Sequence, residues 1–169
     1  DGQTFIPSHS QGPINPMAWP MFHHDLRRSG LYDRTPPTTP VVTDEGQVTK
    51  STTQLYASWT SEEKDSGILE YQYKITEDTI DGNAVKDWTS TGVFYYVTAG
   101  GLGLTEGKTY FFDVKAKNGA EMWSEVGYSD GVTVDITPPT TIDSGIDGLW
   151  HNGPVTVTLT ATDSISGVD

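Results

Sequence analysis

Residues 104–119 read Leu-Thr-Glu-Gly-Lys-Thr-Tyr-Phe-Phe-Asp-Val-Lys-Ala-Lys-Asn-Gly, and they contain the clearest structural signal in the chain. Apolar side chains occupy every second position: Tyr110, Phe112, Val114 and Ala116. A period of two is that of a β-strand with one buried face. The dipeptide Asn118-Gly119 that follows is a strong hairpin signal. The stretch therefore predicts a half-buried strand that ends in a turn.

Similar strand patterns, separated by turn signals, extend from Val41 to Asp135. Further strands are predicted at 53–59 (Leu55, Ala57 and Trp59 inward), 69–75 (Leu69, Tyr71, Tyr73 and Ile75 inward), from Trp88, at 93–99 and at 126–135 (Val132 and Val134 inward). Asp65-Ser66-Gly67 and Asp81-Gly82-Asn83 are predicted to form turns. The pattern gives about seven strands and no helix, which predicts an all-β sandwich of two packed sheets.

The chain also repeats itself at a spacing of about 100 residues, which is the size of one sandwich domain. Matching segments are Thr35-Pro36-Pro37-Thr38-Thr39 with 137–141, Ser66-Gly67-Ile68 with 166–168, and Leu55, Ala57 and Trp59 with Val155, Val157 and Leu159. Alternation from Val155 to Ala161 predicts a strand, followed by a loop from Asp163. We therefore expect one whole domain at 36–135 and the opening of a second at 136–169.

Residues 1–35 differ from the rest, because prolines at 7, 13, 16 and 20 interrupt every regular pattern. This segment still carries large apolar side chains that a simple linker would lack. We predict an extended arm that docks on a protein surface through Phe5, Trp19, Met21, Phe22, Leu31 and Tyr32. The proline-rich stretch at 35–40 would form a stiff boundary.

The overall composition limits the classes of partner. A net charge of −13 disfavours nucleic acid and anionic membranes, but it fits calcium, a cationic surface or simple solubility. The chain has no cysteine, which excludes disulfides, thiol catalysis and thiolate zinc sites. No apolar stretch is long enough to span a membrane. The absence of cysteine from a β protein of this kind favours a bacterial origin and a secreted or cell-surface location.

Two groups of residues are candidate metal ligands. His23, His24 and Asp25 would suit zinc, copper or nickel, but adjacent side chains on an extended chain point to opposite sides. The alternative is that these histidines form hydrogen bonds with a docked surface. Asp143 and Asp147, followed by Gly148, supply part of a calcium loop, although turn formation explains them equally well. No cofactor is expected apart from calcium.

No set of residues predicts an enzyme. Ser66 has no nucleophile-elbow glycines and no partner histidine, and nothing in the pattern buries the adjacent Glu62 and Glu63. An aromatic platform of Trp88, Trp123 and Tyr128 would bind carbohydrate by stacking. The alternative is that these aromatic residues close the edge of the sandwich.

Residues 36–135 resemble a fibronectin type III domain of bacterial secreted proteins. Trp59 matches the core tryptophan of that family and Tyr71 an aromatic of its third strand, while 104–118 is similar to its L-x-x-G-x-x-Y-x-x-x-V-x-A-x-N run. The resemblance implies a structural core around Trp59, Tyr71 and Tyr110. It also implies a tyrosine corner, in which the Tyr110 hydroxyl contacts the backbone near 104–107.

Two further resemblances concern the ends of the chain. Residues 137–169 look like the opening of a bacterial immunoglobulin-like surface repeat, through Thr140-Thr141, 150–155, 159–163 and 166–168. That resemblance implies a structural or surface-display role. Residues 19–30 are similar to a short motif at the edge of bacterial quinoprotein-like β-propellers, and this resemblance implies an adjoining propeller that was lost or lies on another chain.

Together these observations predict a non-catalytic, secreted or cell-surface module with structural and interaction roles. Its arm would dock on a protein partner or a neighbouring domain. The apolar face of Val155, Val157 and Leu159 would be covered by strand addition, which allows self-assembly. Two alternatives stay open: a spacer or carbohydrate-binding domain of a secreted multidomain enzyme, and an accessory subunit of a metal- or haem-containing extracellular assembly.

Overall fold

The computed structural model describes residues 33–145 and 148–168, and every regular element in these two ranges is a β-strand. These ranges contain no helix that is long and apolar enough to cross a membrane. Several residues singled out in the sequence lie outside the described ranges: Phe5, Trp19, Met21, Phe22, His23, His24, Asp25, Leu31, Tyr32 and Asp147.

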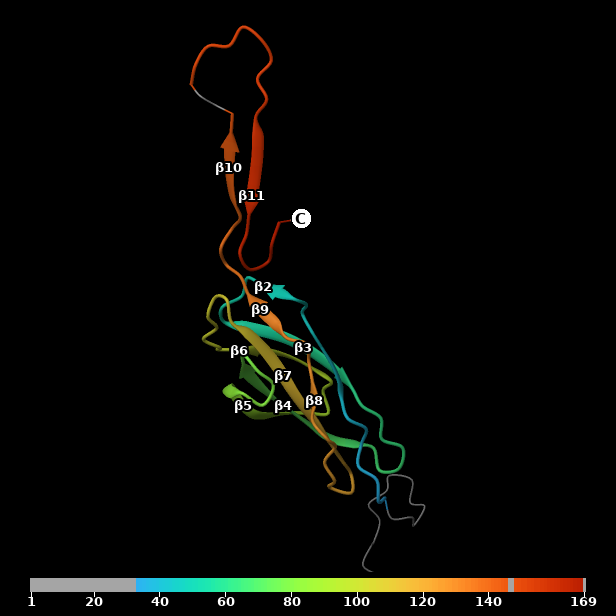
Figure 1. Cartoon of the computed structure of the whole chain (residues 1–169). Coiled ribbons are helices and arrows are strands. Elements are labelled where there is room, and N and C mark those ends of the chain that lie inside the picture. Colours follow the sequence, from blue (N-terminus) through green and yellow to red (C-terminus); the bar gives the residue numbers. More distant parts are fainter. Residues whose placement is uncertain (1–32, 146–147, 169) are drawn as a thin grey trace, which may run out of the picture.

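Two sheets pack face to face to form the body of the molecule (Figure 1). The first contains, in spatial order, β1 (Val41–Asp44), β3 (Gln54–Thr60) and β6 (Tyr96–Gly100). The second contains, in order, β2 (Val48–Thr49), β9 (Val132–Val134), β7 (Thr109–Asn118), β4 (Ile68–Glu77) and β5 (Asn83–Gly92), with β8 (Gly127–Tyr128) also paired to β7. This arrangement is a fibronectin type III or immunoglobulin-like sandwich, which confirms the all-β prediction.

A separate antiparallel hairpin extends from one end of the sandwich (Figure 1). It is made of β10 (Thr140–Ser144) and β11 (Thr158–Thr162). Every residue of these two strands is exposed. The hairpin therefore has no core of its own within the described residues.

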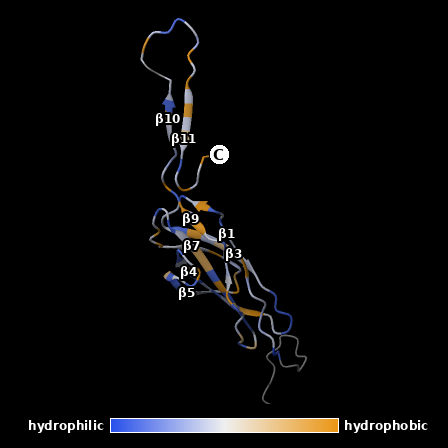
Figure 2. Ribbon diagram, in the orientation of Figure 1, coloured by the Kyte–Doolittle hydropathy of each residue, from blue (hydrophilic) through white to orange (hydrophobic). Residues whose placement is uncertain are grey.

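The core lies between the inner faces of the two sheets. Alternate residues of β3, β4 and β7 point into it, and the side chains of Trp59, Tyr71 and Tyr110 are all buried there. The Trp59 ring lies 6.0 Å from the Tyr71 ring and 6.4 Å from that of Tyr73, measured between centroids. Figure 2 shows the apolar residues concentrated along strands of the sandwich.

The start of β7 has the local geometry that the resemblance implies. The Tyr110 hydroxyl accepts a hydrogen bond of 2.9 Å from the backbone N–H of Thr105, and it donates one of 3.1 Å to Glu77 Oε2. The Tyr110 hydroxyl therefore connects the loop that precedes β7 to the end of β4.

Leu69 is the clearest departure from the predicted pattern, because its side chain is exposed. Opposite β7, Ile68 pairs with Asn118 while Glu70 pairs with Lys117, so Leu69 is the extra residue of a β-bulge. A bulge shifts the alternation by one residue. Ile68 packs against the core in place of Leu69.

Other strand boundaries also differ from those predicted. β5 begins at Asn83 and not at Trp88, while β6 begins at Tyr96 because residues 93–95 form a loop. The closing strand is divided into β8 and β9, and β11 begins at Thr158 and not at Val155. After Asn118 the chain forms a longer loop with Glu121 at φ 64° in place of a two-residue turn.

Gly127 is required where β8 crosses the start of β1. A Cβ atom at this position would lie 1.9 Å from the carbonyl oxygen of Pro40. No side chain fits at that separation, so the close approach of these two segments depends on glycine.

Candidate functional site

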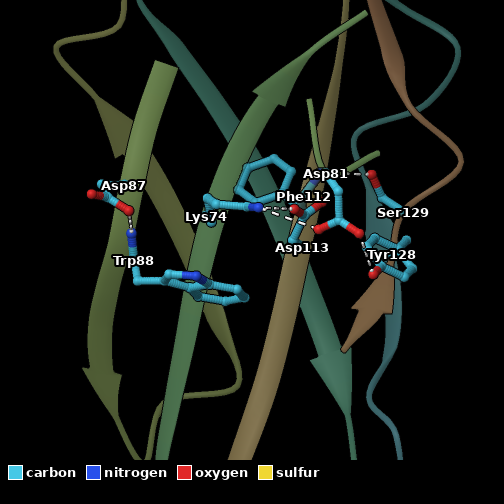
Figure 3. Close-up of polar contacts among 8 residues, drawn as sticks. All are labelled: Lys74, Asp81, Asp87, Trp88, Phe112, Asp113, Tyr128 and Ser129. Carbon is cyan, nitrogen blue, oxygen red and sulfur yellow. Dashed lines mark hydrogen bonds and ion pairs between the residues drawn. The ribbon is translucent and has the colours of Figure 1, made fainter. Parts of the chain in front are cut away.

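A row of side chains crosses the outer face of the larger sheet: Trp88 on β5, Lys74 on β4, Asp113 on β7 and Tyr128 on β8 (Figure 3). Lys74 is the direct cross-strand neighbour of Asp113, and Asp113 is that of Tyr128. The Asp113 side chain is 0% exposed and that of Lys74 is 14% exposed. A fully buried carboxylate is uncommon in proteins unless it is paired.

The β4–β5 connection contacts this row through Asp81, whose side chain is 63% exposed. Asp81, at the end of that connection, has a φ of 56°, and its carboxylate lies beside the row. Lys74 Nζ lies 2.9 Å from Asp113 Oδ2 and 3.4 Å from Asp81 Oδ1. The Tyr128 hydroxyl donates a hydrogen bond of 3.0 Å to Asp81 Oδ2. One ammonium group thus lies between two carboxylates.

Burial dominates the electrostatics of Asp113. Neither of its carboxylate oxygens makes a well-directed hydrogen bond with the described residues, although the Lys74 ammonium contacts one of them. Loss of solvent raises the pKa of Asp113, and the opposing effect of Lys74 is smaller. Burial acts to lower the pKa of Lys74, but contacts with Asp113 and then with Asp81 raise it overall.

Lysine ammonium groups lie over both tryptophans of the predicted carbohydrate platform. Lys115 Nζ lies 4.3 Å from the centroid of the Trp88 ring and 4.5 Å from that of Trp123. These distances allow cation–π attraction. Tyr128 is on the other side of Lys74, where its hydroxyl contacts Asp81. The three aromatic residues therefore do not form one continuous open platform.

A second feature is an exposed apolar segment at residues 93–96, which we call the aromatic cluster. Val93, Phe94, Tyr95 and Tyr96 are 60%, 61%, 61% and 47% exposed. The Tyr96 ring meets the rings of Phe94 and Tyr95 edge-on, at interplanar angles of 65° and 75°. The cluster borders β6, which is an edge strand of its sheet. Four exposed apolar residues in succession are typical of an interaction surface.

A third feature is a hydrogen-bonded junction at Asp33, which we call the first aspartate clamp. Asp33 Oδ1 accepts from Thr35 N at 3.0 Å, and Oδ2 accepts from the hydroxyl of Ser66. Asn118 Nδ2, at the end of β7, donates to Asp33 Oδ2, to Glu63 Oε2 and to the backbone oxygen of Thr35. The clamp therefore joins the start of the domain to the loop after β3 and to the end of β7.

A related arrangement occurs at Asp135, which we call the second aspartate clamp, and here the serine donates through its backbone N–H and not through its hydroxyl. Asp135 Oδ1 accepts from Thr137 N at 3.1 Å, and Oδ2 accepts from Ser166 N at 3.1 Å. Asp163 also accepts from Ser166 N, at 3.0 Å. Each clamp joins an aspartate two residues before a Thr-Pro-Pro segment to a serine of the following Ser-Gly loop. The repeat seen in the sequence thus extends to an aspartate at each junction.

The acidic residues near the first clamp have the ligand types of a cation site. Carboxylate oxygens of Asp33, Glu63 and Asp65 lie within 4.8 Å of one another. However, both oxygens of Asp33 and both of Glu63 already accept hydrogen bonds from the protein. A structural clamp is therefore sufficient to explain the cluster. Asp143, of the predicted calcium loop, is exposed on β10.

The sequence contained a signal for only some of these features. The second clamp could have been found by extending the Thr-Pro-Pro repeat two residues toward the N-terminus. The apolar run at 93–96 is visible in the sequence, but its pattern predicts a strand and not an exposed loop. Nothing in the sequence indicated the Lys74–Asp113 pair, because single charged residues are common at the outward-facing positions of a strand.

Comparison with known proteins finds similar chains among the solved structures. No family model and no curated protein matches the chain. The twitchin kinase region from C. elegans is similar at 21% identity with a TM-score of 0.44, and the match covers 60% of this chain and 17% of that one. Module A71 of titin from human cardiac muscle is similar at 24% identity with a TM-score of 0.39, covering 59% of this chain and 91% of the module. The fold assignment rests on the strand order described above.

Proposed function

We propose that the chain is a non-catalytic spacer and interaction segment of a bacterial protein that is secreted or displayed at the cell surface. The observation that carries this proposal is the second aspartate clamp. Asp135 N donates to Thr49 O of the first sandwich at 2.9 Å, while the Asp135 carboxylate holds the Ser-Gly loop of the next unit. One residue therefore contacts both the sandwich and the unit that follows it. Such a junction suits a spacer.

A substitution at this junction tests the spacer function. We expect Asp135→Ala to increase the backbone mobility of β10 and β11 relative to the sandwich, measured by NMR relaxation on the whole chain. The matched control is Asp130→Ala, which removes an exposed carboxylate nearby. A hairpin that already tumbles independently in the unsubstituted protein would contradict the proposal.

The interaction function is assigned to the aromatic cluster, and the N-terminal arm is its proposed occupant. Tyr95 O accepts a hydrogen bond from Trp59 N near the end of β3, and the loop after β3 meets Asp33 in the first clamp. Asp33, where the described chain begins, therefore lies toward the end of the sandwich that carries the cluster. Its apolar residues and the exposed cluster provide complementary apolar surfaces.

Hydrogen exchange with mass spectrometry tests this docking. We expect slow exchange in segments of residues 1–32 of the unsubstituted chain, and faster exchange in a Phe94→Ser/Tyr95→Ser variant. Ile80→Ser is the control, because Ile80 is also exposed but lies outside the cluster. Protection that grows with protein concentration would indicate docking between copies. Exchange at the rate of an unstructured peptide throughout residues 1–32 would contradict arm docking.

We also propose that a strand from a partner or a neighbouring domain covers the open face of the β10–β11 unit. Val155, Val157 and Leu159 are all exposed there. Carbohydrate binding through Trp123, calcium binding at Asp143 and Asp147, and a metal- or haem-associated role through His23 and His24 remain predictions. Glycan binding that Trp123→Ala abolishes, or metal found in the purified protein, would support the corresponding alternative.

A further inference from the structure

We propose that Lys74 and Asp113 condense to form an intramolecular amide bond that links β4 to β7. The two residues are direct neighbours on adjacent antiparallel strands, with Lys74 Nζ 2.9 Å from Asp113 Oδ2 (Figure 3). Cγ of Asp113, the atom that Nζ would attack, is bonded to that oxygen, so the strand pairing holds the amine and the carboxyl carbon as neighbours. The site would be a self-generated cross-link, which is distinct from the spacer and docking functions proposed above.

The reaction needs only groups that the site contains. One proton passes from the Lys74 ammonium to the Asp113 carboxylate, which gives a neutral amine and a neutral carboxylic acid. The Nζ lone pair then attacks Cγ of Asp113 and forms a carbon–nitrogen bond. The Asp81 carboxylate takes a second proton from Nζ and returns it to the departing hydroxyl, so the carbon–oxygen bond breaks and water leaves. Nothing is oxidised or reduced.

Burial favours the neutral form of Asp113, whereas the carboxylates of Asp113 and Asp81 raise the pKa of Lys74, so the ammonium must first give a proton to Asp113. Asp113 is fully buried, and burial makes its protonated form less unfavourable than in water. Asp81, the proposed proton carrier, lies 3.4 Å from Nζ. The hydrogen bond from Tyr128 to its second oxygen holds that carboxylate beside the pair. The product amide is neutral, so condensation also removes two charges from a poorly solvated place.

Intramolecular geometry provides the driving force that free amines and acids lack in water. Effective concentrations of well-oriented groups reach about 10⁵ M or more. The fold fixes both partners by strand pairing on either side of them, so no further ordering is required.

A second lysine provides an internal comparison. Lys108 Nζ lies 3.6 Å from Glu77 Oε1 and also contacts Asp78, but the Lys108 side chain is 40% exposed. Neither carboxylate partner of Lys108 is fully buried, since their side chains are 28% and 50% exposed. The solvated ion pair is therefore the stable state at Lys108, and no cross-link is expected there.

Intact-mass measurement of the folded, whole chain tests the proposal. We expect a mass lower than that of the sequence by one water molecule, and a branched fragment that joins the Lys74 and Asp113 peptides after proteolysis. Lys74→Ala and Asp113→Ala should each restore the full mass. Asp81→Asn should leave the folded protein at full mass, as judged with circular dichroism, because the proton carrier is lost. Lys108→Ala should retain the mass deficit.

Two outcomes would overturn the proposal. The first is the full sequence mass in unsubstituted protein that has been kept folded for days. The second is a water deficit that maps within one linear peptide, such as a cyclic imide at an Asp-Gly pair like Asp130-Gly131. Both results come from the unsubstituted protein, so they do not depend on whether any variant folds.

Discussion

The Asp113 carboxylate depends on a single neighbouring cation. Lys74→Met leaves this buried carboxylate facing only Asp81 and Tyr128. Relative to protein in which Lys74 and Asp113 are still an ion pair, we expect the substitution to lower the free energy of unfolding by about 3 kcal/mol at neutral pH, as is usual when one partner of a buried pair is removed. Urea denaturation measures this. Lys108→Met, at an exposed ion pair, is the control and should change stability little.

The same variant should show a characteristic dependence on pH. Burial raises the pKa of Asp113 above its value in the unfolded chain. A raised pKa means that the folded state binds the proton more tightly, so stability falls as the pH rises through the interval between the two values. In Lys74→Met the penalty should be complete at neutral pH and should shrink on acidification through the raised pKa. If the difference in unfolding free energy between Lys74→Met and the unsubstituted protein stayed constant from neutral to acidic pH, this prediction would be wrong.

Gly127 gives a second test at the scale of one residue. Gly127→Ala should lower the free energy of unfolding by about 3 kcal/mol, because the new methyl group must displace the Pro40 backbone. Gly103→Ala is the matched control, since a Cβ at Gly103 meets nothing within 4 Å. Equal stability of the two variants would show that β1 and β8 separate easily.

Among the elements, β4 shows both the strength and the limit of alternation as a guide. Tyr71, Tyr73 and Ile75 are buried as predicted, because a strand with one core face must alternate. Leu69 is not, because the bulge opposite Asn118 and Lys117 depends on pairing with a distant strand. The loop at 93–95 escaped prediction for a related reason. Gly92, at φ 61°, allows the chain to leave β5 there, and periodicity carries no record of that turn.

Substitutions in β4 should reproduce this difference. We expect Leu69→Ser to change the free energy of unfolding by less than about 0.5 kcal/mol, as for most exposed positions. Tyr71→Ala should cost about 3 kcal/mol, because it removes a buried aromatic side chain. Thermal or urea unfolding measures both. A large loss for Leu69→Ser would place that side chain in the core.

The hairpin of β10 and β11 is expected to be the least protected pair of strands in the described chain. All its residues are exposed, whereas every residue of β7 is buried or partly buried. Amides of 158–162 should therefore exchange by local opening, and those of 110–116 only by global unfolding. Exchange measured by NMR distinguishes the two. Protection at 158–162 equal to that of β7 would mean that another strand covers the hairpin.

At the scale of the molecule, the repeat could be seen in the sequence, since it depends on local motifs such as Thr-Pro-Pro and Ser-Gly, and the tandem organisation inferred from it stays a prediction. The candidate sites could not be seen there. The Lys74–Asp113–Asp81 group combines two adjacent strands and a loop, and the first clamp combines Asp33 with Asn118. Each requires the register between distant strands, which is set by the packed core and the bulge.

The net charge of −13 has a consequence for the whole chain. Excess negative charge repels itself in the compact state, and dissolved salt screens that repulsion. We expect the melting temperature to rise as sodium chloride is increased from low to physiological ionic strength, measured by calorimetry. A melting temperature that falls over this range would mean that favourable ion pairs outweigh the excess charge.

The path of the chain through the sandwich determines how it responds to tension. The described chain begins at the end far from the β10–β11 hairpin, so a pull on its two ends acts along the length of the sandwich (Figure 1). Ladder hydrogen bonds run across the strands, including those from Thr133 N to Gln47 O and from Asp135 N to Thr49 O, each 2.9 Å. A pull along the strands loads these ladder hydrogen bonds in shear, so that many of them bear the force at the same time. We therefore expect the sandwich to unfold in one step, and not by breaking one hydrogen bond after another.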